Sequence, residues 1–294
     1  MHEPSSCINP LLSRRGQPFG YGTFVRPEAA VSGELIAAYA GGSVAQAALV
    51  AGGAVRCVPG SLRALRHPLF AAVPLLALVG VVVWLRAKPD DAGALAELAL
   101  LAVPLLALIA AARIGLVALA LVVAMVVLTV HDNHSVSGQI AALGLVAASC
   151  TVLGALLVAV TPPRWLGVGI AATAAVDLVL VASGFLAPAT LALNSAGVTD
   201  SLPQLQRVEL GPLTMGFADL FLPALVGALL ATRARTRHWV ALLTLCFALA
   251  AGLVFLVADR LPATVAVALA LLVVEGAGAL APLWRTANAS ARST

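Results

Sequence analysis

The stretch GQIAALGLVAASCTVLGALLVAV, residues 138–160, contains no Asp, Glu, Lys or Arg. A helix rises about 1.5 Å per residue, so a segment of this length covers the roughly 30 Å of hydrocarbon in a bilayer. The bilayer core offers no water to the backbone, and an unbroken apolar segment therefore satisfies its own hydrogen bonds as a helix. The stretch predicts a membrane-spanning helix.

Similar stretches recur along the 294 residues. Seven more lie at about 68–86, 95–111, 114–130, 165–187, 211–231, 239–258 and 261–282. A further candidate, 29–54, is rich in Ala and Gly and contains Glu34, which makes it a weaker span. The predicted fold is all-α, a polytopic transmembrane helical bundle with nine spans, or eight if 29–54 does not cross.

The composition excludes a soluble domain. The chain is 61% apolar and 10% charged, whereas globular chains are about 45–50% apolar and about 25% charged. Its mean hydropathy is +1.03. A transmembrane barrel would show short alternating segments, which are missing here. The lipid bilayer is thus the expected surrounding.

The charged and metal-ligating residues indicate neither nucleic acid nor a cofactor. The net charge of +4 comes from basic residues scattered through short loops, not from a basic domain. His131 and His134 lie in a short loop with no further ligand nearby, so we expect a solvated loop there. The four cysteines are far apart and form no CxxC pair, so no metal or disulfide framework is predicted.

The predicted organisation has three parts: a flexible tail at 1–28, transmembrane helices at 29–160, and a second transmembrane half at 161–294. Arginines occupy every second loop, as the positive-inside rule requires of cytoplasmic loops. This alternation predicts a cytoplasmic C-terminus and a 188–210 loop on the outer side. The expected location is the plasma membrane.

Two aspartates interrupt apolar spans, and intramembrane charges are costly enough to need a reason. Counting about 1.5 Å per residue from the outer ends of their spans, Asp177 lies roughly 15 Å deep and Asp219 roughly 12 Å deep. Glu275, near the end of the last span, is expected to bond within the bundle or reach the interface. The matching depths predict that the two aspartates meet.

Paired carboxyls at low dielectric share a proton, so one acts as a general base while the other donates. Such a pair is compatible with an aspartic protease, with a polar pair that fixes helix packing, and with a proton or cation site in a transporter. Depth and pairing alone leave these alternatives open.

The segment GFADLFLPALVGALL, residues 216–230, resembles the second-aspartate helix of presenilins and signal peptide peptidases, the GxGD-type intramembrane aspartyl proteases. DLVLV at 177–181 resembles their first-aspartate helix, and LPAT at 261–264 resembles the Pro-Ala-Leu element of their last helix. The resemblance covers about residues 164–282. The chain departs from the family pattern at three positions. Ala218 stands where the family has the second glycine of its motif, Val176 replaces the usual tyrosine, and Thr264 replaces the leucine.

The resemblance implies a presenilin-like bundle in which Asp177 and Asp219 form a catalytic dyad. It implies that the substrate is a transmembrane helix that extends and pairs with a strand near 206–210. The residues implied to contact it are Gly216, Phe217, Ala218, Pro262, Ala263 and Thr264. The departures leave a catalytically inactive member, acting as a membrane scaffold, as an alternative to a protease or a transporter; the oligomeric state stays open.

Overall fold

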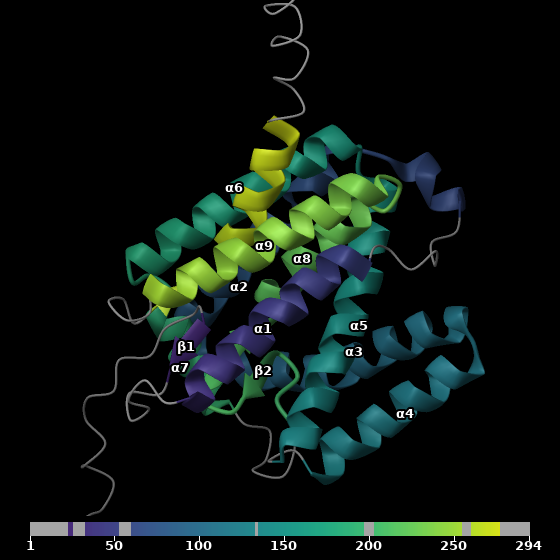
Figure 1. Ribbon diagram of the computed structural model, residues 1–294. Helices are drawn as coiled ribbons and strands as arrows, with labels where there is room; N and C mark the ends of the chain where they lie inside the picture. Colours follow the sequence, from purple (N-terminus) through teal and green to yellow (C-terminus); the bar gives the residue numbers. More distant parts are fainter. Residues whose placement is uncertain are drawn as a thin grey trace, which may run out of the picture.

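The computed structural model describes residues 23–25, 33–52, 60–132, 135–196, 203–254 and 260–276. These residues are mostly helical, and the helices pack side by side as a bundle (Figure 1). The helices are α1 (Gly33–Gly52), α2 (Val73–Ala87), α3 (Ala92–Ile114), α4 (Leu116–His131), α5 (Val136–Val160), α6 (Pro163–Ala182), α7 (Ala187–Ser195), α8 (Phe217–Leu229), α9 (Ala234–Val254) and a last helix, Thr264–Gly276.

Six of the described helices are long and apolar enough to cross a membrane: α1, α2 with the 3-10 turn before it, α3 with the turn before it, α5, α6 and α9. The other three predicted spans contain shorter apolar helices, which are α4, α8 and the last helix. The weakest predicted span, 29–54, therefore contains a helix, α1, that is long and apolar enough to cross a membrane. The short helix α7 lies in the stretch predicted as an outer loop.

Local sequence explains where the central helices begin. The Ser135 side chain accepts a hydrogen bond from the Gly138 N–H, 3.1 Å away, and so caps the first turn of α5. Pro163 occupies the first position of α6, where a missing N–H costs nothing. Only Thr161 and Pro162 separate α5 from α6, so the chain passes almost directly from one helix into the next.

Four short strands correct the prediction of an all-helical chain. They are β1 (Thr23–Val25), β2 (Arg207–Leu210), β3 (Leu213–Gly216) and β4 (Arg260–Leu261), in the order β2-β3-β1-β4. Strands β2 and β3 form a hairpin whose turn contains Gly211 at φ 56°, a conformation that glycine adopts freely. Strand β1, from within the predicted tail, is antiparallel to both β3 and β4.

Helix α8 lies at the centre of the bundle, where it packs against α1, α5 and α6. Glycines allow the close approach: a Cβ on Gly154 of α5 would lie 3.1 Å from the Leu225 backbone. A Cβ on Gly227 would lie 2.9 Å from the Val50 carbonyl oxygen, and closer still to that of Leu49. Glycines at these two contacts thus let α8 pack closely against α5 and α1.

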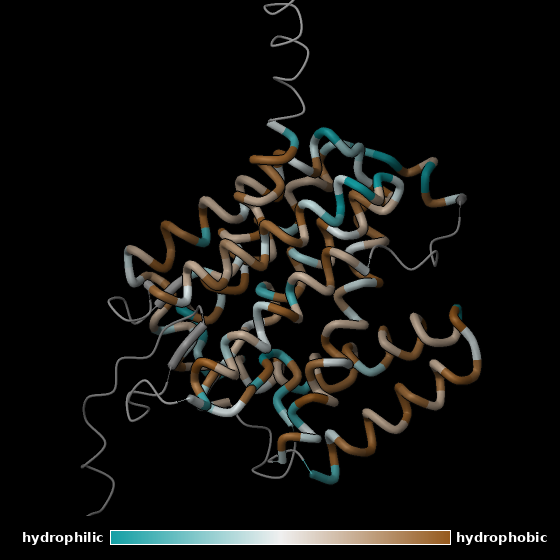
Figure 2. Tube along the Cα trace, in the orientation of Figure 1, coloured by the Kyte–Doolittle hydropathy of each residue, from teal (hydrophilic) through white to brown (hydrophobic). Residues whose placement is uncertain are grey.

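The apolar outer surface is that of a membrane protein. Leu116 and Val117 at the start of α4 are 84% and 86% exposed, and α4 lies at one side of the bundle (Figure 1). Hydrophobic residues run along the helices, and hydrophilic ones gather toward helix ends and turns (Figure 2). Exposed apolar surface of this extent is expected of helices that face lipid.

We expect Gly227→Ala to destabilise the bundle by about 1–3 kcal/mol, because the added methyl overpacks the contact with α1. Gly41→Ala is the matched control, since a Cβ there would meet nothing within 4 Å among the described residues. Thermal unfolding in detergent compares the two. An equal melting temperature for both variants would contradict the close packing of α8 on α1.

Candidate functional site

Helices α6 and α8 bring the two predicted aspartates into one buried site. Asp177 is 8% exposed and Asp219 is 4% exposed, and the helices that carry them are in contact. The charge of the Asp177 carboxyl acts electrostatically on Asp219. Buried carboxyls within each other's field cannot both carry a charge cheaply.

Thr264 holds Asp177 from the first turn of the last helix. Its hydroxyl donates a 2.5 Å hydrogen bond to Asp177 Oδ2, and the threonine itself is 1% exposed. Pro262 places this turn, because a proline two residues before the helix favours an extended entry. The threonine that stands where the resembled family has a leucine is therefore a direct partner of the first aspartate.

Asp219 is held by its own helix start. Gly216 is the N-cap of α8, and its N–H donates a 2.9 Å hydrogen bond to Asp219 Oδ2. This is the reach-back half of a capping box, with the carboxylate at the third helical position. One carboxylate oxygen thus fixes the strand-to-helix junction at which the side chain sits.

The depths expected from the sequence need correction. The count for Asp219 starts at residue 211 and assumes helical rise, but residues 213–216 form β3 and α8 begins only at Phe217. Asp177 lies five residues before the end of α6 at Ala182, about 7 Å at helical rise, not 15 Å. Asp177 thus lies near the end of α6 and Asp219 in the first turn of α8, on two helices that are in contact.

The remaining predicted contact residues surround this junction without all reaching the aspartates. Phe217 stacks on Phe221 one turn later, with ring centroids 6.2 Å apart, and Ala218 is half-buried in the first turn of α8. Pro262 is buried. Ala263 lines a cavity on the α1 side of the site.

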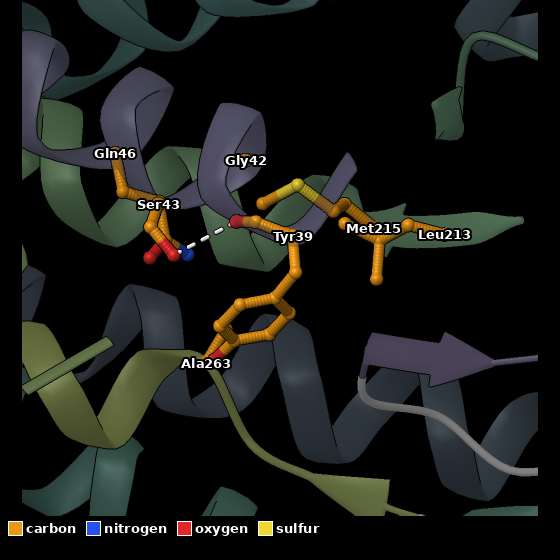
Figure 3. A pocket seen from close by; sticks show the side chains of 7 residues that line it. All are labelled: Tyr39, Gly42, Ser43, Gln46, Leu213, Met215 and Ala263. Carbon is orange, nitrogen blue, oxygen red and sulfur yellow. Dashed lines mark hydrogen bonds between the residues drawn. The ribbon is translucent and has the colours of Figure 1, made fainter. Parts of the chain in front are cut away.

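That cavity has a volume of about 10 Å³, room for roughly one water molecule. It is lined by Tyr39, Gly42, Ser43, Gln46, Leu213, Met215 and Ala263, drawn in Figure 3. Its polar groups come from α1, whereas β3 supplies Leu213 and Met215 just before the N-cap of α8. The cavity therefore adjoins the backbone that carries Asp219.

Sequence reasoning missed the contribution of α1. Gln46 Nε2 donates a 3.0 Å hydrogen bond to the main-chain oxygen of Asp219, and Tyr39 Oη donates a 2.7 Å bond to the Ala248 carbonyl of α9. Tyr39, Ser43 and Gln46 follow the i, i+4, i+7 spacing of one helix face. Polar residues on one face of an otherwise apolar span indicate that this face packs against other helices, and this pattern could have identified α1 as part of the site.

Other polar residues lie apart from the aspartates. Glu275 forms a 2.8 Å ion pair with Arg233 and is about half-exposed. No cluster of three or more His, Cys, Asp or Glu side chains suited to a metal occurs among the described residues. His131 ends α4, while His134 falls outside the described residues.

Comparisons of the chain with protein-family models, with curated proteins and with solved structures found no match.

We expect Thr264→Val to destabilise the fold by about 1–3 kcal/mol, because it removes the donor from a buried carboxyl without changing side-chain volume. Thr264→Ser keeps the hydroxyl and serves as the control. In the Asp177→Ala background, Thr264→Val should lower the stability much less. The difference between the two backgrounds, which measures the coupling of the two residues, should be roughly 0.5–3 kcal/mol. Equal costs in both backgrounds, measured by thermal unfolding in detergent, would contradict the Thr264–Asp177 bond.

Proposed function

We propose that the protein is an intramembrane aspartyl protease that hydrolyses a peptide bond within a transmembrane helix. The observation that carries this proposal is the buried pair Asp177 and Asp219, within electrostatic reach of each other on adjacent apolar helices. An isolated charge in such a place is unfavourable, and a pair that shares one proton removes most of that cost.

The pair supplies the two proton transfers that peptide hydrolysis needs. The ionised carboxylate takes a proton from a water molecule as the oxygen attacks the peptide carbonyl, while the protonated carboxyl donates to the carbonyl oxygen. Collapse of the tetrahedral species breaks the C–N bond, and a proton passes to the departing amine. The bonds from Thr264 and Gly216 hold one oxygen of each aspartate in place.

Further support comes from the elements around the pair. A hairpin, β2 with β3, leads directly into α8, and its first strand, Arg207–Leu210, matches the strand expected from the resemblance near 206–210. The Pro262-Ala263-Thr264 turn lies against Asp177 and the cavity, the position expected of a Pro-Ala element. These features favour a protease over a transporter, for which the chain offers no convincing repeat.

The proposed substrate is the transmembrane helix of another protein, reached through the bilayer. We propose the plasma membrane as the location of the protein, and the loop arginines favour a cytoplasmic C-terminus. Two side-chain bonds agree with the alternation of loops: Arg66 with the Ala159 carbonyl at one end of the bundle, and Arg86 with the Phe185 carbonyl at the other.

The decisive variants are Asp177→Ala and Asp219→Ala. Each removes one carboxyl of the dyad, so we expect fragment release to fall at least about a hundredfold, the loss typical of a missing general acid or base. The assay is cleavage of a tagged single-span reporter by purified protein in liposomes. Asp90→Ala, at an exposed aspartate, is the matched control.

Cleavage that persists in either variant would contradict the proposal. Wild-type protein that releases no fragments from several reporters would also count against it: peptide binding without cleavage would then favour an inactive scaffold, and substrate-dependent proton flux would favour a transporter.

Strand β1 gives a second test of this function. It occupies the place between β3 and β4, where Phe24 pairs with Thr214 and Arg260. The strand near 206–210 that is expected to pair with substrate is β2, which lies at the edge of the described sheet, so substrate bound there leaves β1 in place. A substrate that pairs with β3 would instead have to displace β1. The Phe24→Pro variant lacks the backbone N–H at this position, so β1 loses one hydrogen bond to the sheet, worth about 1 kcal/mol. That loss would favour a substrate over β1 in the place beside β3 by about fivefold.

Because substrate is expected to pair with β2, we expect equal rates of reporter cleavage by Phe24→Pro and by Phe24→Ala, which keeps the N–H. Faster cleavage by Phe24→Pro would show that substrate enters beside β3, in the place of β1. Equal rates for the two variants would show that substrate does not compete with β1.

A further inference from the structure

We propose that Gln46 is a positioning residue for Asp219, acting as the hydrogen-bond donor that Pro223 withholds from the helix. This inference rests on the proposed function for its catalytic readout, but its structural part stands on three observations in α1 and α8.

The first observation is a gap in the backbone ladder of α8. In an α-helix the carbonyl of one residue accepts from the N–H four positions later. The carbonyl of Asp219 should accept from residue 223, and residue 223 is a proline inside the helix. Proline has no N–H, and its ring also crowds the carbonyl four residues earlier. The Asp219 carbonyl is therefore left without its helical partner.

The second observation is that another helix supplies the missing donor. Gln46 Nε2 lies 3.0 Å from the Asp219 main-chain oxygen, in a buried hydrogen bond between residues 173 positions apart. Gln46 is 2% exposed, although glutamine is rarely so buried. Only the amide NH₂ end of glutamine can donate to a carbonyl, which fixes the orientation of the side chain.

The third observation is the shared geometry of the two bonds at Asp219. Its carboxylate accepts from the Gly216 N–H at the helix start, and its main chain accepts from Gln46. Side chain and main chain of one residue are thus tied to two separate elements. A shift of the first turn of α8 would move the carboxylate relative to Asp177, so the bond from Gln46 bears on the alignment of the pair.

Gln46 also lies beside the cavity, on the same face of α1 as Ser43 and Tyr39 (Figure 3). Ser43 donates to the Tyr39 carbonyl within α1 itself, at 2.9 Å. Gln46 instead reaches across to α8. The polar stripe of α1 is therefore divided, and Gln46 is the member whose bond reaches the residue carrying the second carboxyl.

The test is a double-mutant cycle between Gln46→Ala and Pro223→Ala in the full chain. Pro223→Ala returns an N–H to the position from which the Asp219 carbonyl normally accepts. Gln46→Ala should lower kcat about tenfold or more with Pro223 present, the loss that corresponds to one unmade buried hydrogen bond, with KM within about twofold. In the Pro223→Ala background, the same change should cost less than about threefold. Thr129→Val is the control, because this buried hydroxyl bonds within its own helix, to the Met125 carbonyl.

The same four proteins are also melted in detergent, since Gln46→Ala leaves a buried acceptor unpaired and is expected to lower the melting temperature by several degrees. Pro223→Ala should remove most of that loss, including any failure of Gln46→Ala to fold. If Gln46→Ala costs the same in both backgrounds, in rate and in melting temperature, the proposal is overturned. If melting shows the rescue while kcat is unaffected by Gln46→Ala, Gln46 is structural only and its positioning role is overturned.

Failure of the proposed function has a different signature. Wild-type protein inactive on every reporter would overturn the protease assignment, yet the melting cycle would still decide whether Gln46 replaces the N–H absent from Pro223.

Discussion

Two carboxyl side chains, those of Asp177 and Asp219, lie among apolar helices where a lone charge would be expelled to water or neutralised. The rest of the structure is arranged around that constraint. Each carboxyl receives a donor from a helix start, Thr264 for Asp177 and Gly216 for Asp219. These donors exist because the end of α6, the start of α8 and the start of the last helix meet at one place. Gly216 donates a backbone N–H that the helix start leaves unpaired, whereas Thr264 donates its side-chain hydroxyl.

The price of building a site from helix ends is irregular backbone inside an apolar bundle. Residues 213–216 form a strand within an apolar run that continues into helix, and Pro223 interrupts the hydrogen-bond ladder of α8 in its second turn. Non-helical backbone at membrane depth is tolerated only where protein satisfies it. Here the hairpin partner β2 pairs with β3, and Gln46 pairs with the Asp219 carbonyl. Helix α1 is therefore part of the site and not a peripheral span.

The mostly helical, apolar character of the chain and the two aspartates within its apolar runs could be predicted from the sequence, because they rest on strong signals. Long uncharged runs have one low-energy backbone in lipid, and a carboxyl within such a run stands out by its cost. The start of α8 could not be predicted in the same way. GPLTMGFADLF, residues 211–221, is as apolar as a helix, and only Gly211 and Pro212 hint at a turn before it. Hydropathy reports burial, and burial does not distinguish a short paired strand from a helical turn.

The role of α1 was hidden for a related reason. Its polar residues lower its hydropathy, so 29–54 was the weakest span by composition. In a soluble protein such residues would face water, but Tyr39, Ser43 and Gln46 face other helices here. In a bundle surrounded by lipid, the polar stripe of α1 points inward, where its side chains find hydrogen-bond acceptors. The same feature that makes α1 a doubtful span thus makes it a supplier of hydrogen bonds to the irregular start of α8, where the second carboxyl lies.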